Sequence, residues 1–283
     1  MGAKADLSIP ASFLQSGRAL PVTSEISFRH PTLREIFDLD QEHGGLYSEE
    51  LYYAMCSLFL TDPYLYMVYL DDRGLDYEDV SPFQLFLLLL ADHQAALQEL
   101  ANQCSAGEYQ KALEQDIYRR AFRFFFGIDN FYVAKISGEG REAVGYGSGK
   151  FLFDQVSYLY IYEFVKAING IQDGDRIHPE DAHAKQVLIE DERERRKREA
   201  RRRQEDSGDK NSQSRLGNLI SAATWACPGG ITPFNRGDLH IYDLVDAVRR
   251  SDRLLQYNHT LTGLYAGTLD RKGLDLSSLH WAG

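Results

Sequence analysis

The sequence predicts a mainly α-helical fold with a small β element in the middle, which places the chain in the α+β class. Three observations support this prediction. Apolar residues recur at helical spacing on both sides of the middle, capping residues precede several of these segments, and glycines interrupt a stretch rich in Phe, Tyr and Val between them. With 283 residues, 43% of them hydrophobic, the chain is long enough to bury a core.

Three short helices are expected in the N-terminal part. Thr32 and Glu35 have the spacing of a capping box at the start of the first helix, and the glycine pair 44–45 ends it. Ser48 is expected to cap the second helix, because a hydroxyl can accept a hydrogen bond from a free backbone N–H of the first turn. The third covers residues 62–70 and begins at an Asp-Pro pair.

The middle of the chain changes from helical to extended patterns. A long helix is expected from Ser81, which precedes a proline, to about Asn102. Residues 121–136 are rich in Phe, Tyr and Val, which favour strands. Residues 138–153 contain five regularly placed glycines and indicate a hairpin. A further helix is expected at residues 158–168, ended by an Asn-Gly pair.

Composition divides the chain into four parts. We expect an N-terminal arm at 1–24, a helical domain with a central β hairpin at 25–176, a charged helix with a flexible linker at 177–214, and a C-terminal helical region at 215–283. The linker itself is expected from residue 206 onward. In the last part the clearest helix is predicted at 241–255, and a second, shorter helix at 257–265.

The charge is strongly uneven along the chain. The formal net charge is −11, but residues 193–203 contain eight basic and two acidic residues, so the remainder carries −17. An acidic body argues against nucleic-acid binding by most of the chain. The basic run has no aromatic residue for base stacking, and interspersed glutamates favour ion pairs along a charged helix. We therefore expect this helix to dock on an acidic surface and not to read nucleic acid.

The cysteines and the apolar runs point to a reducing, non-membrane setting. Cys56, Cys104 and Cys227 are far apart and form no CxxC pair, which argues against a disulfide framework and a zinc site. The longest apolar run, residues 85–91, is much shorter than the roughly 20 residues that span a bilayer. No membrane association is expected.

A glycine-rich segment at 145–150 resembles a phosphate-binding loop only superficially. A phosphate loop needs a first glycine separated by four residues from its Gly-Lys pair and Ser or Thr after the lysine, but Val144 and Phe151 occupy these positions. We interpret the segment as a turn between strands, and no nucleotide or other cofactor is expected.

An acidic segment has partial EF-hand spacing. Asp38, Asp40, Glu42 and Glu49 stand at positions 1, 3, 5 and 12 of such a loop. Position 6 must be glycine for the sharp turn, and it is His43 here. We therefore expect no calcium site, and the carboxylates are interpreted as a helix end and turn.

No catalytic constellation is recognisable in the sequence. There is no HExxH motif, no paired Cys/His cluster and no Gly-x-Ser-x-Gly elbow. The adjacent pair Asp71 and Asp72 would point about 100° apart on a helix, so the two carboxylates would not share a site. We expect no enzymatic activity, no catalytic residues and no metal.

Several segments with capping residues and Asp/Gly turns resemble a known family. The segments are 30–36, 46–53, 62–67, 70–78, 81–86, 178–180, 263–270 and 280–281. They resemble phage and prophage proteins of Gram-positive hosts that are encoded in the tail module and are described as tail-assembly chaperones. The resemblance implies a noncatalytic protein in the cytoplasm of the infected or lysogenic bacterial host.

The resemblance also implies a partner, the tail tape-measure protein or another tail protein. A long helical polypeptide with apolar stripes needs cover before the tail tube encloses it, and an aromatic-rich helical surface can provide it. Candidate contact residues are Tyr47, Tyr52 and Tyr53, with Tyr265 and Trp281 near the C-terminus. For each of them, burial in the protein's own core is the alternative.

Two other functions remain open at this stage. The chain could be a structural component of the virion, such as a tail or neck adaptor, or a nucleic-acid-associated regulator that uses the basic helix at 193–203. A chaperone is absent from finished particles, whereas an adaptor is present at fixed copy number.

The expected linker predicts where a protease cuts first. Trypsin should cleave between residues 206 and 215, at Lys210 or Arg215, because this segment is polar and carries no predicted helix. A time course of digestion, with fragment masses, measures this directly. Equal resistance of this segment and the neighbouring helices would show that it is packed.

Overall fold

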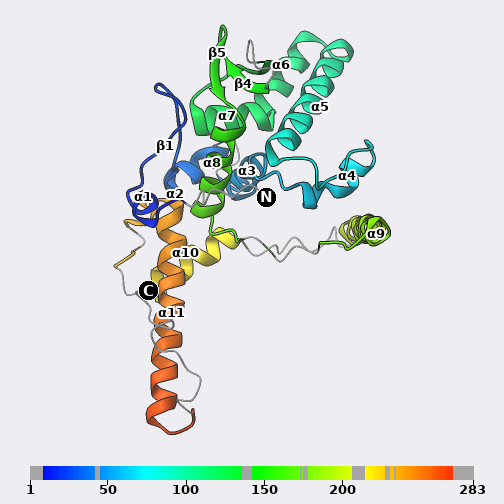
Figure 1. Ribbon diagram of the computed structural model, residues 1–283. Helices are drawn as coiled ribbons and strands as arrows, with labels where there is room; N and C mark the ends of the chain where they lie inside the picture. Colours follow the sequence, from blue (N-terminus) through cyan, green and yellow to red (C-terminus); the bar gives the residue numbers. More distant parts are fainter. Residues whose placement is uncertain are drawn as a thin grey trace.

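Helices make up most of the described chain, and a small antiparallel sheet lies among them (Figure 1). The computed structural model describes residues 9–41, 45–135, 142–172, 174, 178–205, 214–226, 230–232 and 234–269. The predicted α+β class is confirmed. Among the described helices, none combines the length and the apolar character that crossing a bilayer requires.

The first half of the chain forms the helical body and the α5–α6 hairpin. Its elements are α1 (Ala11–Gln15), β1 (Leu20–Pro21), β2 (Ser27–Phe28), α2 (Leu33–Phe37), η1 (Asp38–Asp40), α3 (Ser48–Ser57), η2 (Pro63–Tyr66), α4 (Met67–Asp71), α5 (Pro82–Gln103), α6 (Ala106–Gln115) and α7 (Ile117–Phe126).

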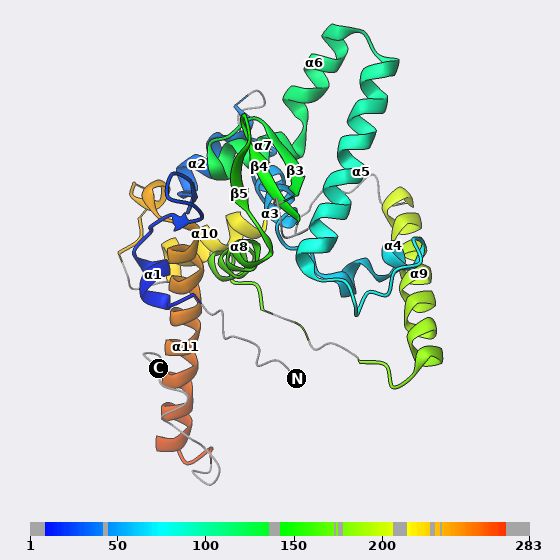
Figure 2. The ribbon, with the colours of Figure 1, turned by 45° about the horizontal axis from the view of Figure 1, so that its top comes forward.

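The second half adds the sheet, α8, α10 and the two long helices α9 and α11. Its elements are β3 (Phe131–Lys135), β4 (Glu142–Tyr146), β5 (Lys150–Phe153), α8 (Gln155–Ile168), α9 (Ala182–Glu205), α10 (Arg215–Ala226), η3 (Arg236–Asp238) and α11 (Ile241–Tyr265). In both views α9 lies at one side beside α4, and the C-terminal half of α11 extends away from the body (Figures 1 and 2).

Local capping explains where the predicted helices begin. The capping box of Thr32 and Glu35 is present at α2, as expected. Ser81 is the expected N-cap of α5, and with Gln84 it also forms a capping box that was not predicted. Ser48 was expected to be an N-cap, but it is the first residue of α3. Its hydroxyl donates to the carbonyl of Phe37 (2.8 Å) and accepts from the backbone N–H of Asp40 (3.1 Å), so it ties α3 to the end of α2.

The prediction of strands over the whole of 121–136 is wrong for its first part, where α7 runs to Phe126. Asp116 caps this helix by accepting from the N–H groups of its first turn, and Gly127 ends it in the left-handed conformation, with φ of 71°. The buried residues recur at helical intervals over two turns: Tyr118, Ala121, Phe122, Phe125 and Phe126. Amphipathic packing therefore outweighs the strand preference of the individual residues.

The sheet follows α7 and has the order β3-β4-β5, with both pairs antiparallel. The predicted hairpin is confirmed for β4 and β5, which a turn at residues 147–149 connects. Gly145 lies where the register shifts, and a Cβ there would approach the ring of Tyr132 to 2.8 Å. Glycine is therefore required by this close approach.

A core of aromatic rings holds the body together. Phe28 stacks on Phe125 with ring centroids 4.5 Å apart, and it meets Phe59 edge-on at 5.4 Å. The same buried cluster includes Leu14 from α1 and Leu216 from α10. Residues from the predicted N-terminal arm and from the C-terminal region thus pack into one core with the middle of the chain.

A short backbone bridge joins residues that are more than 200 positions apart. Leu33 donates its N–H to the carbonyl of Leu239 (2.9 Å), and Ile241 donates to the carbonyl of Pro31 (3.2 Å). Beside this bridge Arg34 forms an ion pair with Asp238 at 2.8 Å. The bridge sets the start of α11, which is one continuous helix and not the two helices predicted at 241–255 and 257–265.

The predicted domain boundaries stay a prediction. Helix α9 agrees with the predicted charged helix, and α10 begins at Arg215. Most of the predicted linker, residues 206–213, lies outside the described residues, as do Glu42, His43, Cys227 and Trp281.

Two histidines meet at the backbone bridge. The ring centroids of His30 and His240 are 4.5 Å apart, and His30 is only 3% exposed, with neither ring nitrogen hydrogen-bonded. Nδ1 of His240 lies 2.9 Å from the carbonyl oxygen of His30. Burial, with a contribution from the neighbouring His240, lowers the pKa of His30 to about 4.

This pKa predicts a specific loss of stability in acid. Between about pH 6.5 and pH 4 the unfolded chain binds a proton at residue 30 that the folded chain does not, so the free energy of unfolding falls as the pH falls. The decrease has an upper bound of about 3 kcal/mol. Chemical denaturation at several pH values should show a shallower decline in His30→Leu than in the natural chain. Parallel curves would contradict the prediction.

Candidate functional site

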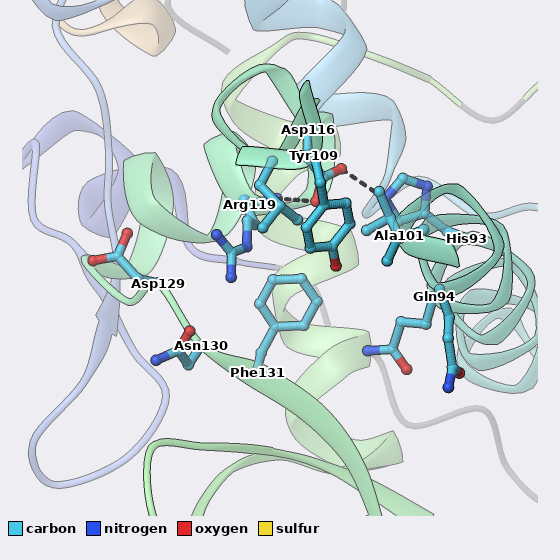
Figure 3. Close-up of a pocket in the computed structure, with 12 residues that line it drawn as sticks. His93, Gln94, Ala101, Tyr109, Asp116, Arg119, Asp129, Asn130 and Phe131 are labelled. Carbon is cyan, nitrogen blue, oxygen red and sulfur yellow. Dashed lines mark hydrogen bonds and ion pairs between the residues drawn. The ribbon is translucent and has the colours of Figure 1, made fainter. Parts of the chain in front are cut away.

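A cleft of about 370 Å³ opens between α5, α6, the start of α7 and β3 (Figure 3). Tyr109 from α6 and Arg119 from α7 project into it. Its walls combine apolar and polar side chains, namely Leu97, Ala101, Leu113, Phe131, His93, Gln94, Gln98, Asp116, Asp129 and Asn130.

A histidine–carboxylate pair lies at the edge of this cleft. Nε2 of His93 is 2.6 Å from Oδ1 of Asp116, and the ring of His93 lies 4.5 Å from that of Tyr118. Asp116 is buried and also accepts from the backbone N–H groups of Tyr118 and Arg119. The pair therefore connects α5 to the N-terminus of α7, and the carboxylate is already occupied by structural hydrogen bonds.

Polar side chains in the cleft offer contacts for a ligand. The residues that line it include no serine, threonine, cysteine or lysine that His93 could activate as a nucleophile. Among the described residues, the guanidinium of Arg119 has no ion-pair partner. Arg119 and the amide of Asn130 could therefore hold a polar group on a ligand.

The glycine-rich segment is a turn between strands, as predicted. Gly147 and Gly149 have positive φ angles, and Lys150 begins β5, where a phosphate loop would begin a helix. The ammonium of Lys150 pairs with Glu25 at 2.8 Å. Its charge is therefore used to join the hairpin to the N-terminal segment.

The acidic segment at 38–49 has structural contacts of its own. Oδ2 of Asp40 accepts from the backbone N–H of Tyr47 (3.0 Å). Glu49 accepts from the backbone N–H of Leu216 (2.8 Å) and from the hydroxyl of Ser214, so it caps α10 from a distant part of the chain. Within the described residues, no three His, Cys, Asp or Glu side chains are grouped as metal ligands.

The predicted contact tyrosines near α3 have different environments. Tyr52 is fully buried, and its hydroxyl donates to Oδ1 of Asn169 at 3.1 Å, so it is a core residue and not part of a surface. Tyr53 is half-buried beneath Arg215, and burial raises its pKa to about 12. Tyr47 is 50% exposed.

Among the described large apolar side chains, the three with the highest exposed fraction lie in the C-terminal part. Tyr265 is 87% exposed at the end of α11, and Leu255 is 50% exposed on the same helix. Trp225 of α10 is 83% exposed, and Phe234 is also exposed. Of these residues, only Tyr265 is among the contact residues predicted from the sequence.

A helical wheel could have identified Trp225. The buried face of α10 consists of Leu216, Ile220 and Ala223. Trp225 follows Leu216 by nine positions, which places it roughly 180° away around the helix. It therefore points away from the core.

The basic run on α9 forms many of the ion pairs that its glutamates predict. Arg195 contacts Glu192 (2.7 Å) and Glu199 (2.5 Å), and Arg196 contacts Glu192 (2.8 Å). These pairs are one helical turn apart, and they reduce the positive charge available to an external polyanion.

Fold and surface together describe a mainly helical α+β protein with exposed apolar side chains in its C-terminal part and a cleft between α5, α6 and α7. Residues 208–283 match a protein-family model described as YomV second domain, which is a phage-derived family. This match covers α10, η3 and α11 and supports a phage or prophage protein. No curated protein and no solved structure matches the chain.

The two classes of tyrosine predict opposite effects of truncation. Tyr52→Ala should destabilise the fold by about 3–5 kcal/mol, because it removes a buried ring and leaves a cavity. Tyr265→Ala should change stability by no more than about 0.5 kcal/mol, because the ring is exposed. Thermal or denaturant unfolding measures both. Similar effects of the two changes would contradict the assignment of Tyr52 to the core.

Proposed function

We propose that the chain is a noncatalytic phage tail-morphogenesis protein, and that it acts as an assembly chaperone for the tail tape-measure protein. The observation that carries this proposal is the exposure of three large apolar side chains, Trp225, Leu255 and Tyr265. These residues lie in the part of the chain that matches the phage-derived family model.

The physical basis is the removal of a partner helix's apolar surface from water. A long helix with an apolar stripe aggregates when it is alone, and each Å² of apolar surface removed from water contributes roughly 25 cal/mol. Large aromatic side chains are effective anchors for such contacts, since they bury much area with few rotatable bonds. Trp225 and Tyr265 have this character, and Tyr47 offers a further exposed ring on the body.

A noncatalytic role agrees with the cleft between α5 and α7. Its His93–Asp116 pair is engaged in structural hydrogen bonds, and its lining residues include no serine, threonine, cysteine or lysine. A role as a nucleic-acid-associated regulator is less favoured, because glutamates neutralise part of the basic run on α9. Binding to DNA or RNA by this run would be salt-sensitive counterion release.

Co-expression tests the proposal. The tape-measure protein of the same phage genome should stay soluble and co-purify with this chain. The double variant Trp225→Glu/Tyr265→Glu should lose this effect at an unchanged melting temperature, because both rings are exposed. Tyr160→Glu on α8 is the matched control, since Tyr160 is also exposed but lies outside the C-terminal part.

Two results would contradict the chaperone role. One is a natural chain that neither binds nor solubilises the tape-measure protein. The other is its presence at fixed copy number in purified virions, measured by mass spectrometry, which would make it a structural component such as a tail or neck adaptor.

A further inference from the structure

Helix α9 lies against α4 with one buried aliphatic side chain at the contact (Figure 2). Ile189 is 5% exposed and packs into a second, smaller core cluster with Val68, Leu70, Tyr77 and Leu85. Val187 is exposed and Leu188 is only partly buried, so Ile189 is the apolar anchor of α9 among the residues whose burial is described.

A lysine lies one turn before this anchor and contacts two carboxylates. Nζ of Lys185 is 2.6 Å from Oδ1 of Asp76 and 2.5 Å from Oε2 of Glu78, and it lies 4.8 Å from the ring centroid of Tyr77. Burial alone would lower the pKa of Lys185, but its hydrogen bonds to Asp76 and Glu78 outweigh this effect and raise the pKa. The ammonium therefore stays charged at this contact.

Two arginines follow the anchor. Arg193, one turn after Ile189, contacts Asp71 (3.0 Å) and Asp72 (2.8 Å). Arg196 donates to the backbone carbonyl of Leu65. The contacts of α9 thus follow the pattern Lys-x3-Ile-x3-Arg-x2-Arg along one helix face.

The attachment of α9 combines the buried side chain of Ile189 with these ion pairs. The side chains of Arg193, Asp71 and Asp72 are between one third and about one half exposed, so water and salt screen their pairing. Within α9 the pairs formed by Arg195 and Arg196 stabilise the helix itself. Helix α9 can therefore keep its structure when these contacts open, and the face of α4 beneath it would then present an apolar patch bordered by four carboxylates.

We propose that this face is a binding site for a basic amphipathic helix of a protein partner, and that α9 occupies it as an internal ligand. The site, here called the acidic seat, consists of Val68 and Tyr77 with the carboxylates Asp71, Asp72, Asp76 and Glu78. A partner helix that fits it carries an aliphatic residue with basic residues four positions before and four positions after it. This site lies on α4 and its following loop, so it goes beyond the function proposed for the C-terminal surface.

Charge complementarity selects this class of partner. The chain outside 193–203 carries −17, which steers basic segments toward it. An apolar helix without flanking cations would leave the carboxylates of the acidic seat without the ion pairs that α9 now provides. Helix-in-groove recognition by anchors at such spacings is a common mode of peptide binding.

A labelled peptide with the sequence of residues 182–197 is the probe, and fluorescence anisotropy measures its affinity for the full-length chain. In the natural chain α9 competes with the peptide at a high effective concentration. The double variant Lys185→Glu/Arg193→Glu should open the acidic seat, because the new carboxylates repel it. Peptide affinity should then increase by about tenfold or more, and added salt should weaken the binding.

Two controls and one alternative variant complete the test. The peptide with Ile189→Asp should not bind, and the opened chain with Asp76→Lys added should lose peptide affinity. If the opened chain proves unstable by circular dichroism, the single variant Ile189→Asp in the chain opens the seat through its apolar anchor instead.

The proposal is overturned if both opened chains bind the peptide no better than the natural chain, or if binding is insensitive to Asp76→Lys. It is also overturned if the natural chain forms dimers by exchange of α9, seen in light scattering and absent from the opened chain. That result would assign the acidic seat to a second copy. None of these outcomes involves the tape-measure protein, so they leave the co-expression test independent.

Discussion

The backbone bridge between residues 31–33 and 239–241 is the constraint on which the rest of the structure depends. It joins the start of α2 to the start of α11 through two backbone hydrogen bonds. Because α11 is one continuous helix, its anchored first turns set the direction of its exposed C-terminal half. The contact with the N-terminal segment therefore determines where the exposed apolar side chains of α11 lie.

The C-terminal part shares its core with the body. Leu216 and Ile241 are buried in the same cluster as Phe28, and Glu49 of α3 caps α10. A unit that buries its apolar face only against the body gains little stability alone. Its family match covers about a quarter of the chain, yet the physical unit that folds includes much of the remainder.

Charges in this protein serve attachment between segments. Lys150 joins the hairpin to the N-terminal segment, and Lys185 with Arg193 joins α9 to the region around α4. These ion pairs are partly exposed, so each contributes little to the stability of the fold. They determine instead which surfaces are covered, as at the acidic seat beneath α9.

The sequence by itself determined the local features. The capping box at Thr32, the N-cap at Ser81 and the turn of the hairpin depend on residues within a few positions of each other, and all agree with prediction. Tertiary structure decided the remainder, because burial depends on contacts between distant residues. Residues 121–126 belong to a helix because their rings pack into the core. The hydroxyl of Tyr52 donates to Asn169 across the core, whereas the side chain of Tyr265 is exposed. Periodicity indicates which residues share a face, but only the folded chain establishes which face is covered.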